Sequence, residues 1–444
     1  MRFVDTIKNI WKIEDLRKRI TITIALVLVY RFGCYVVLPG INPAEVDALK
    51  NFTSGGLMQL LDMFSGGAFS QASIFALGIM PYITASIVIQ LLGMVLPSFQ
   101  KMQREGESGR TKLNQYTRYL TVVILLLQGP AYLMNFQYQV HAAGGVSSFG
   151  FWTMIYLTII LAAGSMFIMW LGEKITDKGI GNGISFIILV GIIARFPGAF
   201  IEEFTNRLTT AQGGLVMFLV EIILLFAVIA GAVLLVQGTR KVPVQYAKRI
   251  VGNKQVGGVR QYIPLKVNAA NVMPIIFAQA IMFIPITLAG FGSNGQNSAF
   301  VRAFSDMSGF WYNLVYFFLI IAFTYFYTAV TVRPSDMADG LKRNNGFIPG
   351  VKPGTKTADY LDSIMSRITF PGSIFLGIVA IMPAFARICG VSQNFAQFFG
   401  GTSLLIVVGV VLDTLAQVES HLSMHHYDGL MKSGKIKGRT TGSY

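Results

Sequence analysis

Apolar stretches of about 20 residues recur from one end of this chain to the other, and no other feature of the sequence restricts the fold as strongly. A helix of that length crosses the roughly 30 Å hydrocarbon core of a bilayer. Clear examples are Ile20–Leu38, Gly214–Val236 and Trp311–Val332. Only 13% of the residues are charged, about half the share in a soluble domain. The sequence therefore predicts an all-α integral membrane protein.

Ten such stretches can be placed along the 444 residues, and we expect each to be a transmembrane helix. They lie near residues 20–38, 72–96, 119–138, 151–171, 183–200, 214–237, 271–290, 311–332, 368–386 and 402–418. Residues 1–19 are polar and basic, and no small-residue cleavage site follows the first stretch. We therefore expect that stretch to remain as span 1 and not to be a cleaved signal.

Lysine and arginine are distributed unevenly between the two sides that this placement defines. Thirty of the 36 fall in the N-terminal segment, the even-numbered connections and the tail. The other side holds five, namely Lys50, Arg195, Arg207, Arg302 and Arg387. Cytoplasmic loops carry such an excess, so we expect both termini in the cytoplasm, which requires an even number of spans. The bias also explains most of the net charge of +15 without nucleic acid, and we expect no direct DNA binding.

Five spans precede the external connection near residues 201–213, and five follow it. Two halves with an odd number of spans have opposite orientations, as in inverted-topology repeats, although no residue-level repeat is visible. We expect an N-terminal half at residues 1–205, a C-terminal half at residues 206–444, and a hinge at Glu202–Gly214.

The external connection after span 1 contains a short apolar segment, Leu57–Phe64, with glycine pairs on both sides. It is long enough for about two helical turns and far too short to span a bilayer. Two interpretations stay open from the residues alone. It is either an external surface helix or a short stopper folded back into a cavity, where irregular backbone is tolerated at membrane depth.

Two cytoplasmic connections, residues 238–268 and 332–367, are long. The first has seven positive charges and no acidic residue, and its partial alternation of polar and apolar residues favours a short β-hairpin. A solvated loop would explain the sign of the charge but not the length. Connections longer than about 12–15 residues are usually functional or disordered, so we expect a docking surface for an acidic or nucleic-acid-bearing partner.

Motifs of enzyme chemistry are missing from the sequence. No HExxH, Walker A, CxxC or GxSxG pattern occurs, so we expect neither an enzyme nor a cofactor. His421, His425 and His426 have a spacing that could seat a metal, but we favour interfacial packing and expect no metal. Cys34 and Cys389 lie in or beside apolar runs, and we expect them to be buried apolar residues and not a disulfide.

Several stretches resemble the SecY family of protein-conducting channels in the same order and spacing, from about residue 15 to 435. They are MFSGGAFSQASIFALGIMPYITASIVIQLL (Met63–Leu92), EGESGRTKLNQYTRY (Glu105–Tyr119), MWLGEKITDKGIGNGISFII (Met169–Ile188), YAKR (Tyr246–Arg249), PLKVN (Pro264–Asn268), ADGLKRNNGFIPGVKPGTKTADYLD (Ala338–Asp362) and FGGTSLLIVVGVVLDTLAQVES (Phe399–Ser420). The resemblance implies ten spans in two inverted five-helix halves around an hourglass channel. It also implies that unfolded, signal-bearing polypeptides pass through this channel, or leave it sideways into lipid.

The resemblance further implies a narrow waist lined by a ring of isoleucines. Carried over by motif, the ring residues are Ile79, Ile83, Ile184, Ile188, Ile276 and Ile406. Two pairs have i, i+4 spacing and so lie on one helix face. An empty apolar ring can dewet and block ions. Without the resemblance, contact with lipid or a neighbouring helix would explain such pairs equally well.

The resemblance implies that the short apolar segment is the plug of the channel. Its plug residues are Leu57, Met58, Leu60, Leu61, Met63 and Phe64. Spans 2, 3, 7 and 8 would form a lateral gate with polar residues Gln90, Asn182 and Asn268. Hydrogen bonds there are worth only about 1 kcal/mol, weak enough for a signal helix to break. Asn182 and Asn268 could instead be helix caps.

The long cytoplasmic loops match those that dock the ribosome and the SecA motor ATPase in the family. The docking residues are Lys248, Arg249, Lys254, Arg260, Lys342, Arg343 and Lys352. Lys352 and Asn253–Lys254 stand where many bacterial members have arginine, so the bidentate geometry of arginine is lost there. The resemblance also implies the small subunits SecE and SecG, signal-bearing preproteins and membrane lipid as partners, and a cytoplasmic (inner) membrane location.

Two other functions are compatible with ten spans. A small-solute transporter would need the ionisable residues that lie within spans, Glu221 or Asp413, to bind solute or an ion; Arg31 lies near the outer end of span 1 and could snorkel. A membrane scaffold would conduct nothing. The scarcity of ionisable residues in the spans argues against a coupled transporter.

Overall fold

A computed structural model describes residue 11 and residues 13–41, 62–142, 150–209, 214–246, 249–251, 254–256, 260–270, 272–290 and 309–432. Ten helices correspond to the ten predicted spans. They are α2 (Glu14–Gly33), α5 (Met80–Val95), α7 (Glu107–Ala142), α8 (Phe151–Lys178), α9 (Gly183–Thr209), α10 (Gly214–Gln237), α11 (Met273–Gly290), α13 (Phe310–Thr331), α15 (Thr355–Ile388) and α17 (Gly401–Lys432). Among the described residues, seven helices are long and apolar enough to cross a membrane, or eight if a bent pair counts as one span.

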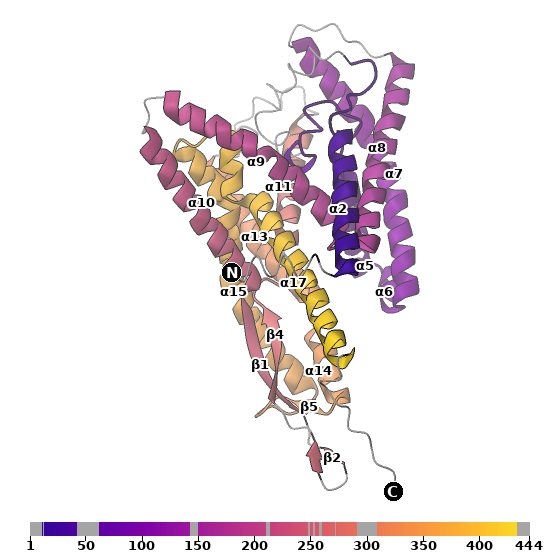
Figure 1. Cartoon of the computed structure of the whole chain (residues 1–444), viewed down its shortest axis with the longest axis vertical. Helices are drawn as coiled ribbons and strands as arrows, with labels where there is room; N and C mark the ends of the chain where they lie inside the picture. Colours follow the sequence, from indigo (N-terminus) through magenta and orange to yellow (C-terminus); the bar gives the residue numbers. More distant parts are fainter. Residues whose placement is uncertain are drawn as a thin grey trace. The chain divides into compact units, whose positions relative to one another are not determined.

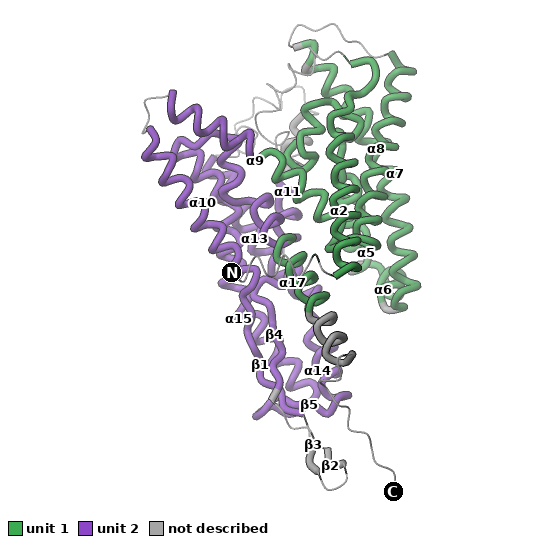
Figure 2. Tube along the Cα trace, viewed as in Figure 1, with its two compact units in different colours: residues 1–195, 410–444 green, residues 196–409 purple. Residues whose placement is uncertain are grey.

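The chain forms two compact units, residues 1–195 with 410–444 and residues 196–409 (Figure 2). This division differs from the predicted halves at 1–205 and 206–444. Helix α9 continues to Thr209, beyond the predicted end of span 5, and its later turns pack Phe196 against Phe395 within the second unit. The end of α17 belongs to the first unit, where Gln417 accepts a hydrogen bond from the Gly181 amide. The inverted relation of two five-helix halves stays a prediction.

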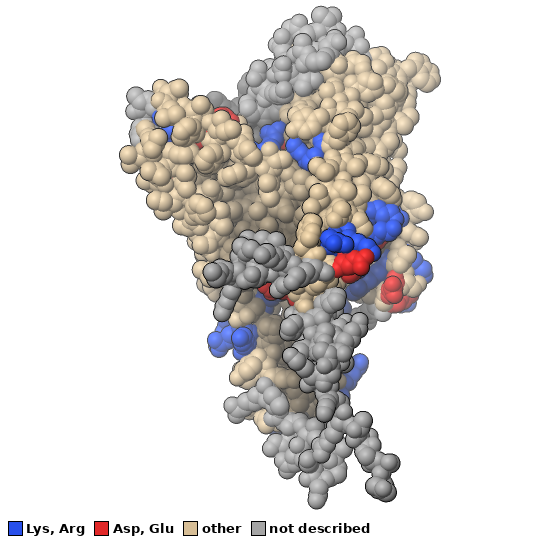
Figure 3. Space-filling model, viewed as in Figure 1, with Lys and Arg blue, Asp and Glu red and all other residues tan. Residues whose placement is uncertain are grey.

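The first unit is built around long helices that lie side by side (Figure 1). Helices α7 and α8 pack along their lengths, with Leu133 and Phe136 of α7 and Leu157 and Leu161 of α8 in one buried cluster. Charged side chains gather at the end of this unit near α6 (Pro97–Arg104), and most of the visible surface beyond it carries none (Figure 3). A surface this poor in charge is suited to contact with lipid.

The start of span 2 differs from its prediction. We expected a helix from residue 72, but α5 begins at Met80, and turns occupy residues 65–79 after a helical end at 62–64. Gly66, Gly67 and Gly78 have positive φ angles there, which side chains oppose and glycine permits. An apolar composition shows burial but does not separate a helix from a buried run of turns. We refer to residues 62–79 as the turn segment.

The predicted hairpin in residues 238–268 is confirmed. Strand β1 (Thr239–Tyr246) pairs antiparallel with β4 (Arg260–Lys266), and β5 (Gly346–Phe347) adds to the free edge of β1. A second small hairpin pairs β2 (Arg249–Val251) with β3 (Lys254–Val256). Val242 and Val244 of β1 are buried against Leu341 of α14 (Pro334–Arg343) and Leu361 of α15. The two long loops therefore share one apolar core and form one folded body.

Candidate functional site

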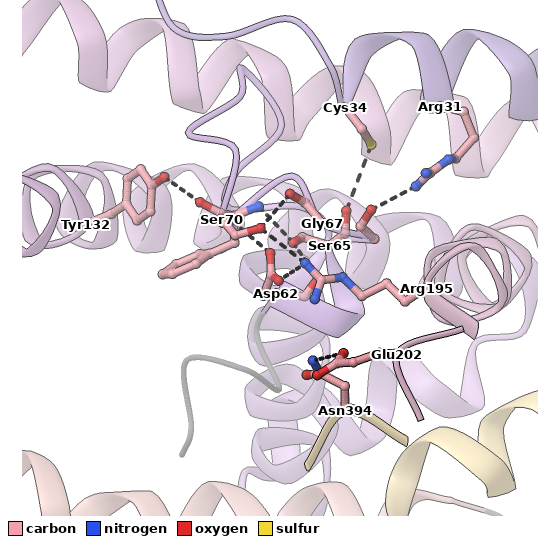
Figure 4. A network of polar contacts seen from close by, with 12 residues as sticks. Arg31, Cys34, Asp62, Ser65, Gly67, Ser70, Tyr132, Arg195, Glu202 and Asn394 are labelled. Carbon is pink, nitrogen blue, oxygen red and sulfur yellow. Dashed lines mark hydrogen bonds and ion pairs between the residues drawn. The ribbon is translucent and has the colours of Figure 1, made fainter. Parts of the chain in front are cut away.

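The turn segment is largely buried within the first unit, and Figure 4 shows the polar contacts that hold it. Ala68, Ala72 and Ser73 are fully inaccessible to solvent. A segment of irregular backbone at membrane depth must satisfy its polar groups within the protein. Helices α2, α7 and α9 supply hydrogen-bond partners for these polar groups.

Helix α2 holds the middle of the turn segment through its C-terminal end. Arg31 donates from Nη1 to the Gly66 carbonyl at 2.8 Å, and the Tyr30 hydroxyl donates to the Ser65 carbonyl at 3.2 Å. Helix α7 adds the Tyr132 hydroxyl, which donates to the Phe69 carbonyl at 3.0 Å. Arg31 therefore has a partner inside the protein and does more than snorkel to the interface.

Helix α9 holds the same segment through an ion pair. The Arg195 guanidinium contacts one carboxylate oxygen of Asp62 and donates to the Ser70 hydroxyl at 3.1 Å. The other Asp62 oxygen accepts the Ser70 amide at 2.7 Å. Asp62 is buried, with 2% of its side chain exposed. Sequence reasoning missed both residues as a pair, because Asp62 lay in a short apolar segment and Arg195 was counted as an external charge.

Glycine makes the close approach of the turn segment to its neighbours possible. A Cβ atom on Gly191 of α9 would lie 3.2 Å from the Phe64 carbonyl oxygen and from the Gly66 nitrogen. A Cβ atom on Gly164 of α8 would lie 2.3 Å from the Ile74 carbonyl oxygen, which is a severe clash. The two helices therefore accept this backbone only because they lack side chains at the contact.

The predicted plug is only partly within the described residues. Leu57, Met58, Leu60 and Leu61 lie outside them. Met63 and Phe64 are described, are 3% and 7% exposed, and belong to the buried turn segment. The plug as a whole stays a prediction.

The predicted ring residues divide between the two units. In the first unit, Ile79 lies at the start of α5 and is buried, Ile83 lies one turn later and is half-buried, and Ile184 and Ile188 lie one turn apart on the first turns of α9. In the second unit, Ile276 lies half-buried on the first turn of α11, and Ile406 lies buried on α17. Their role as a ring stays a prediction.

The predicted gate residues have different surroundings. Asn182 is exposed, and its Oδ1 accepts the amides of Ile184 and Ser185 at 3.1 and 3.4 Å, so it caps α9. Gln90 is half-buried on α5, and Asn268 is buried after β4. The helices that correspond to the predicted gate spans pack as α5 with α7 in the first unit and as α11 with α13 in the second.

Three of the predicted docking residues, Lys342, Arg343 and Lys352, have described side chains. Lys342 and Arg343 are exposed at the end of α14, and Lys352 is exposed shortly before α15. Lys248 lies outside the described residues, and only the backbone of Arg249, Lys254 and Arg260 is described. The exposed cations suit a contact with an anionic partner.

A buried ionic cluster in the second unit was also missed. Arg207 of α9 donates from Nε to Glu203 at 2.9 Å and from Nη2 to Glu221 of α10 at 2.5 Å. Glu221 was predicted only as an isolated residue within a span, because sequence spacing does not show that α9 continues past residue 200. Asp413 is exposed and accepts a hydrogen bond from Gln417 at 3.3 Å.

The remaining predictions concern cysteines and metals. Cys34 is buried, as expected, but Cys389 is exposed at the end of α15, and both thiols are free. Burial was wrong for Cys389 because α15 ends just before it. No group of metal ligands occurs among the described residues; the side chains of His425 and His426 lie outside them.

Comparison with known proteins gives one consistent result. A family model described as SecY matches residues 73–415. A protein translocase subunit SecY of Streptomyces galbus is 42% identical over 433 residues, covering 95% of this chain and 98% of that protein. The protein of the same name from Mycobacterium bovis is 40% identical over 454 residues, covering 97% and 99%.

Solved structures resemble this chain in fold. A SecY structure, described as showing that the plug domain stabilises the closed translocation channel and maintains a membrane seal, matches with a TM-score of 0.62 and 18% identity, covering 91% of this chain and 92% of that one. Sec61 from a canine ribosome–channel complex matches with a TM-score of 0.53 and 16% identity, with the same coverage.

Proposed function

The chain belongs to the SecY family, and on that premise we propose that it is the channel subunit through which unfolded, signal-bearing polypeptides cross the cytoplasmic membrane or leave sideways into lipid. The observation that carries the proposal is the turn segment. A stretch of irregular backbone, buried in a membrane-spanning unit and held by three helices, is a costly arrangement that a simple helix bundle does not need. A segment that closes the channel and moves aside when a polypeptide passes would account for this arrangement.

The chemistry of the chain supports a passive channel. The sequence contains no nucleotide-binding motif, so an external motor or the ribosome supplies the driving force. The family's partners SecE, SecG and the SecA ATPase are part of this proposal, with Lys342, Arg343 and Lys352 in the docking surface. Both termini lie in the cytoplasm, as the distribution of lysine and arginine indicates.

The transporter alternative receives little support. It needs Glu221 or Asp413 to bind a solute or an ion. Glu221 is buried and already engaged by Arg207. Asp413 is exposed on α17 and accepts a hydrogen bond from Gln417, and no group of three or more His, Cys, Asp or Glu residues that could hold a metal ion occurs among the described residues.

Reconstitution into liposomes tests the proposal. The chain and its partner subunits are supplied with the motor ATPase, ATP and a signal-bearing polypeptide, and protease protection of the polypeptide is measured. We expect protection only with an intact signal and only in vesicles that contain the chain. Solute uptake that is lost on neutralising Glu221, without any protection of polypeptide, would indicate a transporter. Vesicles that conduct nothing would indicate a scaffold.

A further inference from the structure

The ionic cluster of the second unit contains two carboxylates and one guanidinium, all buried. The side chains of Glu203, Arg207 and Glu221 are 1%, 7% and 4% exposed. If both acids were ionised, the cluster would carry a net charge of −1 in the interior of the protein. An uncompensated charge is the strongly destabilising case for buried ion pairs.

The hydrogen bonds of the two acids are unequal. Glu203 is well satisfied, because Oε1 accepts from Arg207 Nε at 2.9 Å and Oε2 accepts from the Ser392 amide at 2.8 Å. Glu221 accepts from Arg207 through Oε1, but its buried Oε2 has no hydrogen-bond partner among the described residues. An ionised carboxylate with one bare buried oxygen is the less stable form of that group.

Other charged groups around the cluster do not balance it. Glu202 precedes Glu203 on α9, is exposed, and accepts a hydrogen bond from Asn394 at 2.7 Å (Figure 4). Arg387 near the end of α15 is half-buried and forms no ion pair with either acid among the described residues. Helix α10 carries no other charged residue. Arg207 also donates from Nη2 to an uncharged group, the Gly390 carbonyl, at 2.8 Å.

We propose that Glu203 and Glu221 together bind one proton, carried chiefly by Glu221, so that the cluster is neutral. Two carboxylates that share one site generally hold a proton between them, because both cannot ionise at low cost. The neutral cluster ties the end of α9, the start of α10 and residues 390–392 together. Loss of the proton would leave a buried negative charge and loosen that tie.

The proposal predicts the direction of a pH effect. The folded protein holds one proton that the unfolded chain releases above an ordinary glutamate pKa of about 4.3. Because the folded state then binds more protons, stability falls as pH rises through the range in which only the folded state is protonated. The unfolding equilibrium constant should increase by up to tenfold per pH unit for one proton.

The test uses the purified full-length protein in detergent or lipid. Infrared difference spectra of wild type between the ends of the range from pH 6 to 10 should contain the carbonyl stretch of a protonated carboxyl group. Glu221→Gln should remove this band. Thermal midpoints measured from pH 6 to 10 should fall with pH in wild type and fall less in Glu221→Gln. Glu419→Gln, an exposed acid on α17, is the matched control and should follow wild type.

Each other outcome would overturn the proposal. Absence of the carboxyl band in wild type, or its persistence in both Glu221→Gln and Glu203→Gln, would show that the pair holds no proton. Parallel pH curves for wild type and Glu221→Gln would show the same. Failure of Glu221→Gln to fold would also contradict it, since glutamine is a neutral isostere of the protonated acid. None of these readouts depends on polypeptide transport.

Discussion

Arg195 on α9 and Asp62 in the turn segment form an ion pair inside the first unit, although 133 residues separate them. The pair joins the end of the predicted plug, where the turn segment begins, to the transmembrane helix α9. It also orients Ser70, whose amide and hydroxyl contact the same two side chains. The position of the turn segment therefore depends in part on this charge pair, which mutation can test.

Neutralising either partner should make the closed protein leak. Asp62→Asn keeps an oxygen that can accept the Ser70 amide but removes the charge, so it isolates the ion pair. We expect each single variant, Asp62→Asn or Arg195→Gln, to destabilise the closed state by roughly 1–3 kcal/mol, the cost of a buried group left without its partner. The measurement is ion leakage from proteoliposomes without a substrate polypeptide.

A double-mutant cycle separates the pair from general damage. Asp62→Asn combined with Arg195→Gln should leak less than the sum of the two single variants, because each single variant leaves one unpaired charge and the double variant leaves none. Strict additivity would mean that the two side chains act independently.

Close packing of Gly191 against the turn segment gives a second prediction. Leucine at this position would push against the backbone of Phe64 and Gly66, since even a Cβ atom lies only 3.2 Å from both. We expect Gly191→Leu to leak and to lower the thermal midpoint, and Gly191→Ala to do so less. Gly198→Leu is the matched control on the same helix, because no atom lies within 4 Å of its Cβ position. Equal effects at the two glycines would refute the packing account.

A charge in the predicted isoleucine ring should change conduction. Lysine at Ile83 or Ile406 would keep water in a constriction that otherwise dewets when empty. We expect Ile83→Lys and Ile406→Lys to raise ion conductance in planar bilayers, while Ile83→Leu stays near wild type. Unchanged conductance and unchanged polypeptide transport in both lysine variants would count heavily against the ring.

The exposed cations of α14 should contribute to docking. Reversing both Lys342 and Arg343 to glutamate should weaken binding to ribosomes or to the motor ATPase roughly thirtyfold, if each reversal costs about 1 kcal/mol. Higher salt should reduce the difference. Lys18→Glu, an exposed cation on α2, serves as control. Equal binding by the reversed variant and the control would place the docking surface elsewhere.

Hydrophobicity and charge predict the spans well because a bilayer imposes both on every helix. All ten predicted spans have a corresponding helix, and the hairpin in residues 238–268 was predicted from its alternation. The turns at residues 65–79 could not be predicted, since apolar residues such as Ile74 and Ala76 are compatible both with a buried helix and with buried turns. The continuation of α9 through Glu203 to Arg207 was missed because charged residues resemble a loop until their partners are known.

The functional site was also predicted only in part. The resemblance identified the ring and plug positions by motif, but it assigned no role to Asp62, Arg195 or the Glu203–Arg207–Glu221 cluster. Pairs such as Asp62 with Arg195 arise from tertiary packing, which a single sequence does not reveal. A local contact can be predicted from the sequence, as Asn182 shows. Its hydrogen bonds to the amides of Ile184 and Ser185 follow the known preference for asparagine at helix N-caps.

Photo-crosslinking at Ile83 tests the central claim most directly. A photoreactive residue at this position is challenged with a signal-bearing polypeptide arrested midway through export, and Val216, exposed on α10, carries the same probe as control. We predict a crosslink at Ile83 that requires both the signal and the arrest, and none at Val216. If the polypeptide still crosses the membrane while Ile83 never crosslinks, the polypeptide does not pass the predicted ring, and the account is contradicted.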